Sequence, residues 1–162
     1  MDKETGNTNI EYIRVYGHDQ LDDAKELFME YSRSIGISLC FQGFDEELDS
    51  LPGKYSPPKG SLMLAYVGGR AAACAALRYV SDDICELKRV FVRDDFRGSG
   101  LGRGIVSRMI DEARALGYGY MRLDTLPSMA DAQKLYFSLG FHEIEPYIYN
   151  PHKGTLYMEL KL

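Results

Sequence analysis

Residues 96 to 104 read FRGSGLGRG, with glycine at every second position and the arginines Arg97 and Arg103 on either side of the centre. Glycine is favoured where φ must be positive or where a ligand must approach the backbone. The stretch before it predicts a strand over 85–92, and the apolar spacing after it predicts a helix. Free N–H groups at the start of a helix, together with two guanidinium groups, favour phosphate binding. The alternative is a glycine-rich turn that binds nothing.

The order of the glycines excludes two common phosphate loops. The dinucleotide pattern G-x-G-x-x-G fails, because its last position is Arg103 counted from Gly98 and Ile105 counted from Gly100. The nucleoside-triphosphate pattern also fails, because the chain contains no Gly-Lys-Ser or Gly-Lys-Thr. The sequence therefore does not predict a nucleotide-phosphate enzyme of either type.

The pattern that does fit is R-x-x-G-x-G, at Arg97, Gly100 and Gly102. It resembles the acyl-CoA pyrophosphate loop of the GNAT family, the Gcn5-related N-acetyltransferases. ADAQKLYFSLGF, over 130–141, is similar to the second motif of that family, a helix with A-x-x-L-Y that ends in Leu-Gly-Phe. The resemblance covers residues 61–145. It implies the GNAT fold, an α/β (mixed α+β) domain whose central mixed, mostly antiparallel sheet of six or seven strands carries helices on both faces.

The resemblance also implies acetyl-CoA as co-substrate, with its pantetheine along the strand before the glycine loop. Cofactor contacts are thereby assigned to the strand residues Val90, Phe91 and Val92 and to the loop residues Arg97, Gly98, Ser99, Gly100, Leu101, Gly102 and Arg103.

Tyr136 occupies the tyrosine position of A-x-x-L-Y, so the resemblance implies that it protonates the departing thiolate. A phenol has a pKa near 10 and a thiol one near 8.5, which is close enough for proton transfer. The alternative is a tyrosine that only fills the core beside Leu135 and Leu139.

Glu86 is the candidate base, because it lies eleven residues before Arg97, where family members with a strand glutamate place theirs. Strand alternation predicts that it shares a face with Lys88, Val90 and Val92. Two alternatives stay open: a surface glutamate paired with Lys88 or Arg89, and an orienting role beside a chain of waters that takes the proton.

One position departs from the family pattern. An asparagine that contacts the cofactor often lies seven residues before the tyrosine, and here that position is Met129. Asp124 or Ser128 could compensate for the missing amide, and Pro127 is expected to start the helix.

The resemblance places the amine acceptor near three segments, ISLCFQGF, YSPPKG and PYIYNPHKG. Tyr55, Tyr147 and Tyr149 could form an aromatic wall for a cation, and Gln42, His142 and His152 could supply polar contacts. The alternative for each is loop packing or solvated surface. The two histidines have no third partner at metal-ligand spacing, so no metal site is predicted.

The composition fits one soluble domain over 10–162 of the 162 residues, after a disordered tail over 1–9. No signal peptide or membrane span is predicted. The cysteines, Cys40, Cys74 and Cys85, are odd in number, and the apolar strand contexts of Cys74 and Cys85 predict buried thiols and hence a reducing, cytoplasmic compartment. A net charge of −5 argues against nucleic-acid binding and mildly favours a cationic substrate. A homodimer through the C-terminal strands is compatible with the sequence.

Apolar periodicity and turn residues predict the element order. Expected strands cover 10–15, 61–67, 71–80, 85–92, 120–124, 142–144 and 155–160, and expected helices cover 19–35, 44–51, the stretch after the glycine loop and 128–139.

The function expected from these features is direct transfer of an acetyl group from acetyl-CoA to a primary amine of a small molecule or peptide. The alternative is a module of the same fold that binds acyl-CoA as a sensor or interaction platform, with little turnover. Met129 keeps that alternative open, whereas Tyr136 and the complete R-x-x-G-x-G argue against it.

Overall fold

The computed structural model describes residues 9–16, 18–36, 39 and 43–162. The expected disordered tail, apart from Asn9, and the residues Cys40 and Gln42 lie outside this part of the chain. In chain order the elements are β1 (Ile10–Arg14), α1 (His18–Ser34), α2 (Phe44–Ser50), η2 (Gly53–Tyr55), β2 (Ser61–Val67), β3 (Arg70–Ser81), β4 (Ile84–Val92), η3 (Asp94–Phe96), α3 (Leu101–Ala115), β5 (Tyr120–Thr125), α4 (Ala130–Ser138), β6 (His142–Ile144) and β7 (Leu156–Lys161).

The strands form one seven-stranded sheet in the order β1-β2-β3-β4-β5-β7-β6. Its pairs are antiparallel except for the parallel pair β4–β5, between which the chain crosses over through α3. The β2–β3 hairpin turns at Gly68 and Gly69, whose φ angles of 57° and 81° suit a tight hairpin turn. The predicted mixed, mostly antiparallel sheet is therefore confirmed.

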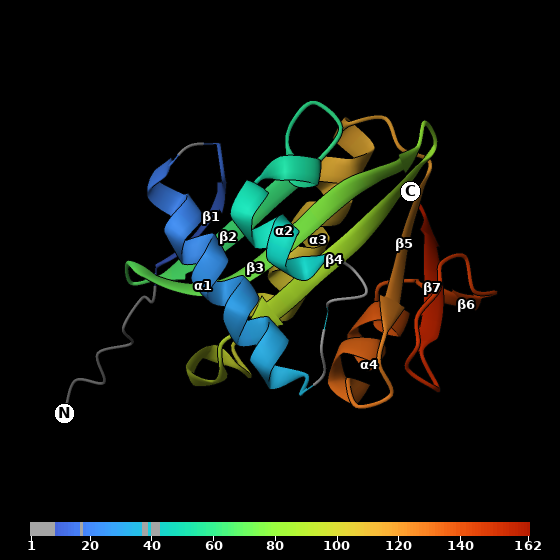
Figure 1. The fold of residues 1–162 in the computed structure, drawn as a ribbon. Helices are drawn as coiled ribbons and strands as arrows, with labels where there is room; N and C mark the ends of the chain where they lie inside the picture. The colour runs from blue at the N-terminus through green and yellow to red at the C-terminus, as the bar shows by residue number, and fades with distance from the viewer. Residues whose placement is uncertain (1–8, 17, 37–38, 40–42) are drawn as a thin grey trace.

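Two apolar layers cover the two faces of the sheet. Helix α3 packs on one face through Ile105, Val106 and Met109, and α1 packs on the other through Leu27 and Phe28. Figure 1 shows α1 and α2 in front of β3 and β4, with α3 behind the same strands. The alanine-rich strand β3 contributes small buried residues to both layers, which lets helices approach from both sides.

Strand β4 contains a bulge that the sequence did not predict. Cys74 pairs with Phe91 and Ala76 with Lys88, so Arg89 and Val90 both oppose Ala75. Arg89 has a φ of 60°, the only positive value at a non-glycine residue in the described part of the chain. Such a bulge inserts one residue and changes which side chains share a face.

The bulge makes one prediction wrong. Leu87 before the bulge and Val90 and Val92 after it pack against the same apolar layer, on the α3 face. By alternation Glu86 and Lys88 therefore face the opposite side, toward α1 and α2. Glu86 shares a face with Lys88 as predicted, but not with Val90 or Val92.

Helix α4 begins later than predicted. Its first residue is Ala130 and its N-cap is Met129, so Pro127 does not start the helix and lies in the preceding turn. No helix among the described residues is long and apolar enough to cross a membrane.

Candidate active site

Strands β4 and β5 separate partway along their length. They pair only over Ile84 to Glu86 and Tyr120 to Arg122, although β4 continues to Val92 and β5 to Thr125. We call the region between the unpaired parts of the two strands, Leu87 to Val92 of β4 and Leu123 to Thr125 of β5, the split. Along it, the β4 edge that faces β5 has no strand partner among the described residues. Figure 1 shows the two strands close together at their N-terminal ends and diverging toward α4.

The unpaired edge of β4 presents main-chain groups of Val90 and Val92. The N–H of Arg93 donates to the carbonyl of Ala72 on β3 at 2.8 Å, so alternation turns Val92 and Val90 toward the split. Phe91 differs from them, because it pairs with Cys74 on β3 and its ring contacts that of Tyr31. Of the three predicted strand contacts, the structure brings Val90 and Val92 to the split and turns Phe91 away from it.

The glycine loop lies where β4 ends and α3 begins. Within the described chain, the backbone N–H groups of residues 98–103 donate no hydrogen bond, and Gly100 caps α3 without a side-chain contact. The first turn of a helix leaves such donors free, and its dipole adds positive potential. The loop is therefore a set of unsatisfied donors suited to a pyrophosphate.

Two glycines of the loop are needed for their backbone conformation. Gly98 and Gly100 have φ angles of 79° and 81°, and an added Cβ at either would meet no atom within 4 Å. At Gly102 a Cβ would lie 3.6 Å from Leu135 Cδ2 and 3.9 Å from Val92 Cγ2. At Gly104 it would collide with the hydroxyl of Tyr12, so the absence of a side chain there is needed for packing.

The other predicted loop residues present different groups. Arg97 and Arg103 are exposed; Arg97 donates to the carbonyl of Val92 at 3.3 Å, and Arg103 donates to Ser138 Oγ on α4 at 2.6 Å. Ser99 Oγ donates to the carbonyl of Phe96. The side chain of Leu101 is buried in the core, so only its main chain faces outward. Both arginines can turn toward a phosphate without breaking a buried contact.

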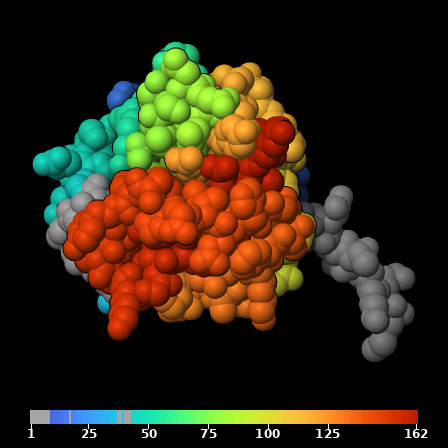
Figure 2. Space-filling model, turned by 90° about the vertical axis from the view of Figure 1, so that its right-hand side faces the viewer, coloured from blue at the N-terminus to red at the C-terminus, as the bar shows by residue number. Residues whose placement is uncertain are grey.

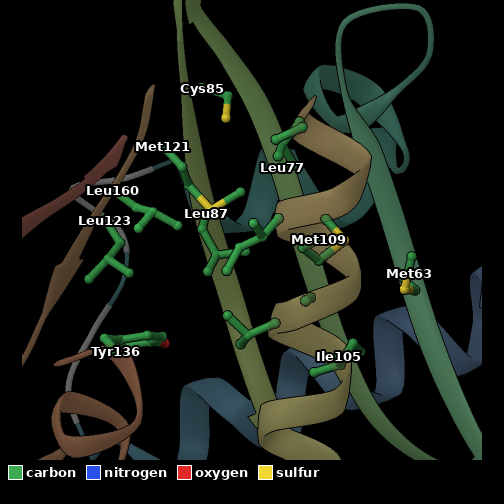
Figure 3. Packing of buried hydrophobic residues seen from close by; sticks show 14 of the residues in the cluster. Met63, Leu77, Cys85, Leu87, Ile105, Met109, Met121, Leu123, Tyr136 and Leu160 are labelled. Atoms are coloured by element: carbon green, nitrogen blue, oxygen red, sulfur yellow. The ribbon is translucent and has the colours of Figure 1, made fainter. Parts of the chain in front are cut away.

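Tyr136 is both a core residue and a residue of the split. Its side chain is buried, and its ring packs edge-on against Phe141 with the centroids 5.6 Å apart. In Figure 3 the ring lies beside Leu123, and its hydroxyl points away from β5 toward β4. That hydroxyl makes no hydrogen bond with the residues described here. Burial raises the pKa of the Tyr136 phenol, which keeps it protonated at neutral pH.

Glu86 is completely buried and has three partners. Arg78 Nε lies 2.7 Å and Lys88 Nζ 3.6 Å from Oε1, while the hydroxyl of Tyr147 donates to Oε2 at 2.6 Å. Burial would raise the pKa of the Glu86 carboxyl, but Lys88 and Arg78 outweigh it and lower that pKa. The surface alternative is therefore wrong about burial, although the expected pairing with Lys88 is present.

Glu86 belongs to a wider group of buried charges on the α2 face of β4. Arg89 donates to Glu47 of α2 at 2.8 and 3.1 Å, and Lys54 lies 3.1 Å from the same carboxylate. We call Glu47, Glu86, Lys88 and Arg89, with Lys54 and Arg78 at the rim, the charged layer. Burying ions is costly unless each is paired, so this layer must be assembled as a unit.

The 145–155 segment connects both sides of the split. Tyr147 reaches Glu86 on β4, and Asn150 donates to Asp124 on β5 at 3.2 Å. The ring of Tyr147 also packs edge-on against that of Tyr157 on β7. Figure 2 shows that the chain after residue 140 covers much of the side of the molecule that carries β5, β6 and β7.

The structure separates the residues expected around the acceptor. Tyr55 is fully buried and donates to Glu47, so it is a core residue and not part of a pocket wall. Tyr149 is 78% exposed and His142 is exposed. Of the two tyrosines in the 145–155 segment, only Tyr147 reaches the charged layer, through Glu86. No group of three His, Cys, Asp or Glu side chains in the described ranges is placed to hold a metal ion.

Cys74 and Cys85 are buried free thiols, as predicted. Burial raises the pKa of the Cys85 thiol to about 12, so this sulfur is not a nucleophile at neutral pH. Neither cysteine is therefore a candidate for a covalent step.

Comparison with known proteins agrees with this geometry. A family model described as the acetyltransferase (GNAT) family matches residues 21–141. The chain belongs to the GNAT family. GNAT proteins transfer acetyl groups and use acetyl-CoA.

Two relatives match nearly the whole chain. An uncharacterised N-acetyltransferase of Schizosaccharomyces pombe is 39% identical, with 96% of each chain covered. One of Dictyostelium discoideum is 31% identical, with 91% of this chain and 97% of the relative covered. A solved acetyltransferase of Streptococcus agalactiae has a TM-score of 0.78 at 21% identity, covering 94% of this chain and 98% of its own. This last likeness concerns the fold alone.

Sequence reasoning missed Glu47 and Arg78 as partners in the charged layer. A signal was present, because Glu86, Lys88 and Arg89 follow one another closely in a strand that is otherwise apolar. Charges in the middle of a central strand must be paired, which predicts a buried network. The sequence did not identify Glu47 as the partner of Arg89, 42 positions away.

Proposed function

We propose that this GNAT protein transfers an acetyl group from acetyl-CoA directly to the primary amine of a small molecule or peptide. The observation that carries the proposal is the split: β4 offers an unpaired edge immediately before a loop whose amides have no acceptors. Acetyl-CoA supplies the acetyl group as a thioester. The main chain of 98–103 would bind its pyrophosphate, with Arg97 and Arg103 adding charge, and Val90 and Val92 would hold its pantetheine arm.

Tyr136 is proposed as the acid of this reaction. Its hydroxyl is protonated, has no partner among the described residues and points from α4 toward β4. It would donate its proton to the sulfur that leaves as the carbon–sulfur bond breaks.

Glu86, the predicted base, is better suited to a positioning role. Both of its oxygens already accept contacts, and its lowered pKa makes it a weak proton acceptor. We infer that it holds Lys88, Arg78 and Tyr147 in place beside the split. Asp124, on the β5 side, is the carboxylate better placed to take the ammonium proton through water, since only its Oδ2 accepts a hydrogen bond from the described residues.

The amide missing at Met129 has a candidate replacement. Asn150 lies beside Asp124 at the split and carries a side-chain amide of the type that Met129 lacks. A cytoplasmic location and the absence of nucleic-acid and membrane partners are proposed from the composition, and a homodimer is proposed from the C-terminal strands. One relative, 30% identical over 70% of this chain and 41% of its own length, is named N-acetylaspartate synthetase (Danio rerio), which is consistent with a small-molecule acceptor.

The test combines calorimetry with thiol release. The full chain should bind acetyl-CoA at micromolar concentration and should not bind ADP or NADH comparably. Tyr136→Phe should keep that affinity while kcat falls about 10²- to 10⁴-fold, the usual contribution of a positioned acid. If wild type binds acetyl-CoA but acetylates no amine, the sensor alternative replaces the enzyme.

A further inference from the structure

Lys88 occupies an unusual position for an ammonium group. Its side chain is only 6% exposed, and it lies on β4 two residues beyond the last residue paired with β5. Its one ionic partner among the described residues, Glu86 Oε1, lies 3.6 Å away, which is longer than a hydrogen bond. Lys88 therefore brings three N–H donors to the split without a hydrogen-bond acceptor in the described chain.

The carboxylates around Lys88 are too few to neutralise all the cations of the charged layer. Glu86 is already bonded by Arg78 and Tyr147, and Glu47 is already bonded by Arg89 and Lys54. The charged layer thus holds four cations against two carboxylates. A buried cation in such surplus is costly unless an anion joins it.

The opposite side of the split carries the complementary charge. Asp124 lies on β5 two residues beyond the last residue paired with β4, and its negative charge favours the protonated ammonium of Lys88. An acceptor bound between the two strands would thus meet a cation on the β4 side and a carboxylate on the β5 side. Such a pair fits a ligand that carries an anion and an ammonium close together.

We propose that Lys88 binds a carboxylate of the acceptor, so that the amine substrate is an amino acid or a related amine with a carboxylate near its nitrogen. Asp124 would face the ammonium of the same molecule before it loses its proton. This inference rests on the proposed acetyl transfer and narrows its acceptor. It also replaces the expectation of a cationic acceptor, which came from the net charge of the whole chain.

A different role for Lys88 must be distinguished by experiment. Burial lowers the pKa of its ammonium, although Glu86 opposes the shift, and a lysine with a lowered pKa can act as a base. A base would affect every amine substrate alike. A carboxylate anchor would affect only substrates that carry the carboxylate.

The experiment uses the full chain with acetyl-CoA and follows thiol release. The acceptors are the twenty L-amino acids, each compared with its own primary amide, which keeps the amine and side chain but removes the negative charge. Because the amide also changes the reactivity of the amine, the decisive quantity is how a substitution changes the acid-to-amide ratio of kcat/KM. The variants are Lys88→Met and Lys88→Arg, with Lys54→Met as the control from the rim of the same layer.

The expected result is a wild-type preference for at least one amino acid over its amide. Lys88→Met should lower kcat/KM for that amino acid roughly 10- to 100-fold, the worth of a hydrogen bond to a charged group, and change the amide less than about threefold. Lys88→Arg should keep part of the preference, and Lys54→Met all of it. Unchanged acetyl-CoA affinity and thermal midpoint would show that the fold is intact.

The opposite results would overturn the inference. Acetylation of amides alone, or an equal loss for acids and amides in Lys88→Met with a shifted pH profile, would leave acetyl transfer established and remove the carboxylate anchor. If acetyl-CoA binds and neither class is acetylated, the anchor fails; the proposed acetyl transfer fails with it only if polyamines, aminoglycosides and peptides are not acetylated either. If Lys88→Met does not fold, the wild-type ratios and Lys88→Arg still decide the question.

Discussion

The glycine loop and the charged layer are built in opposite ways. The loop is one contiguous segment, and its donors are main-chain N–H groups that are free because of where α3 begins. The charged layer is assembled from α2, η2, β3 and β4, and its members hold one another by ion pairs across up to 42 positions of sequence. A ligand site made by the backbone can thus be recognised in a short motif, whereas one made by paired side chains cannot.

The two regions should also fail in different ways. Apart from Leu101, the loop contributes little to the core, so damage there should reduce acetyl-CoA binding more than stability. The charged layer is buried between α2 and the sheet and has fewer carboxylates than cations, so the loss of a carboxylate there should reduce stability first.

The largest effect is expected for Glu47→Ala. The substitution removes the carboxylate that is bonded to Arg89, a residue that is only 3% exposed. Removing one partner of a buried pair should lower the free energy of unfolding by about 3–5 kcal/mol, measured by urea denaturation. The control is Glu46→Ala, an exposed neighbour on the same helix, which should cost less than about 0.5 kcal/mol. Similar small losses for both variants would mean that the layer is not a structural unit.

The next effect is expected for Gly100→Val in the loop. Valine is strained at a φ of 81°, so the loop must change its path and turn its amides away from the pyrophosphate. The Kd for acetyl-CoA should rise about 100-fold or more, since two hydrogen bonds to a charged group are lost. Calorimetry measures this change.

Gly117→Val is the matched control for that loss. Gly117 has a φ of 91° just beyond the C-terminal end of α3, and an added Cβ meets nothing within 4 Å. Both valine variants should lose about 1–2 kcal/mol of stability through backbone strain. Only Gly100→Val should lose acetyl-CoA. Weaker binding in both would show that strain in α3, and not the loop amides, controls the site.

Local patterns were enough to predict most of the fold. The Gly68–Gly69 hairpin, the β4–loop–α3 unit and the alternating strands depend on neighbours in sequence, and the structure confirms them. The bulge at Arg89 could not be predicted, because nothing in its side chain indicates a positive φ. The wrong prediction that Glu86 shares a face with Val90 and Val92 followed from the bulge at Arg89. The split does not follow from local patterns either, since it depends on where β4 and β5 stop pairing. Only the family resemblance, which places pantetheine along this strand, indicated it.

The pH dependence of stability should come from the charged layer. Burial would raise the pKa values of Glu47 and Glu86, but their cationic neighbours lower both below the ordinary value of 4.5. A carboxyl whose pKa is lowered by folding contributes stability that is present above its unfolded pKa and lost as the pH falls through the folded one. The unfolding free energy should therefore decrease from about pH 5 downward.

The double variant Glu47→Gln, Glu86→Gln identifies the source of that decrease. Its stability should be lower than that of wild type at pH 7, and the difference should shrink as urea denaturation is repeated toward pH 3. The glycine loop, 97–104, contains no carboxylate and gives no such dependence. A difference that stays constant over this range would assign acid sensitivity to other groups.

The smallest effect is expected for Tyr147→Phe, which tests the contact between the 145–155 segment and the charged layer. Its hydroxyl is bonded to Glu86 Oε2 at 2.6 Å, so its loss should cost about 1 kcal/mol of stability. Arg78 and Lys88 still hold Oε1, which limits the damage. The KM for the amine should rise about threefold while the Kd for acetyl-CoA stays constant.

The control is Tyr149→Phe, at a 78% exposed position of the same segment, which should change neither constant. A change in acetyl-CoA affinity in Tyr147→Phe would mean that the glycine loop and the charged layer are coupled across the split. The two regions would then differ in how they are built but would not act independently in ligand binding.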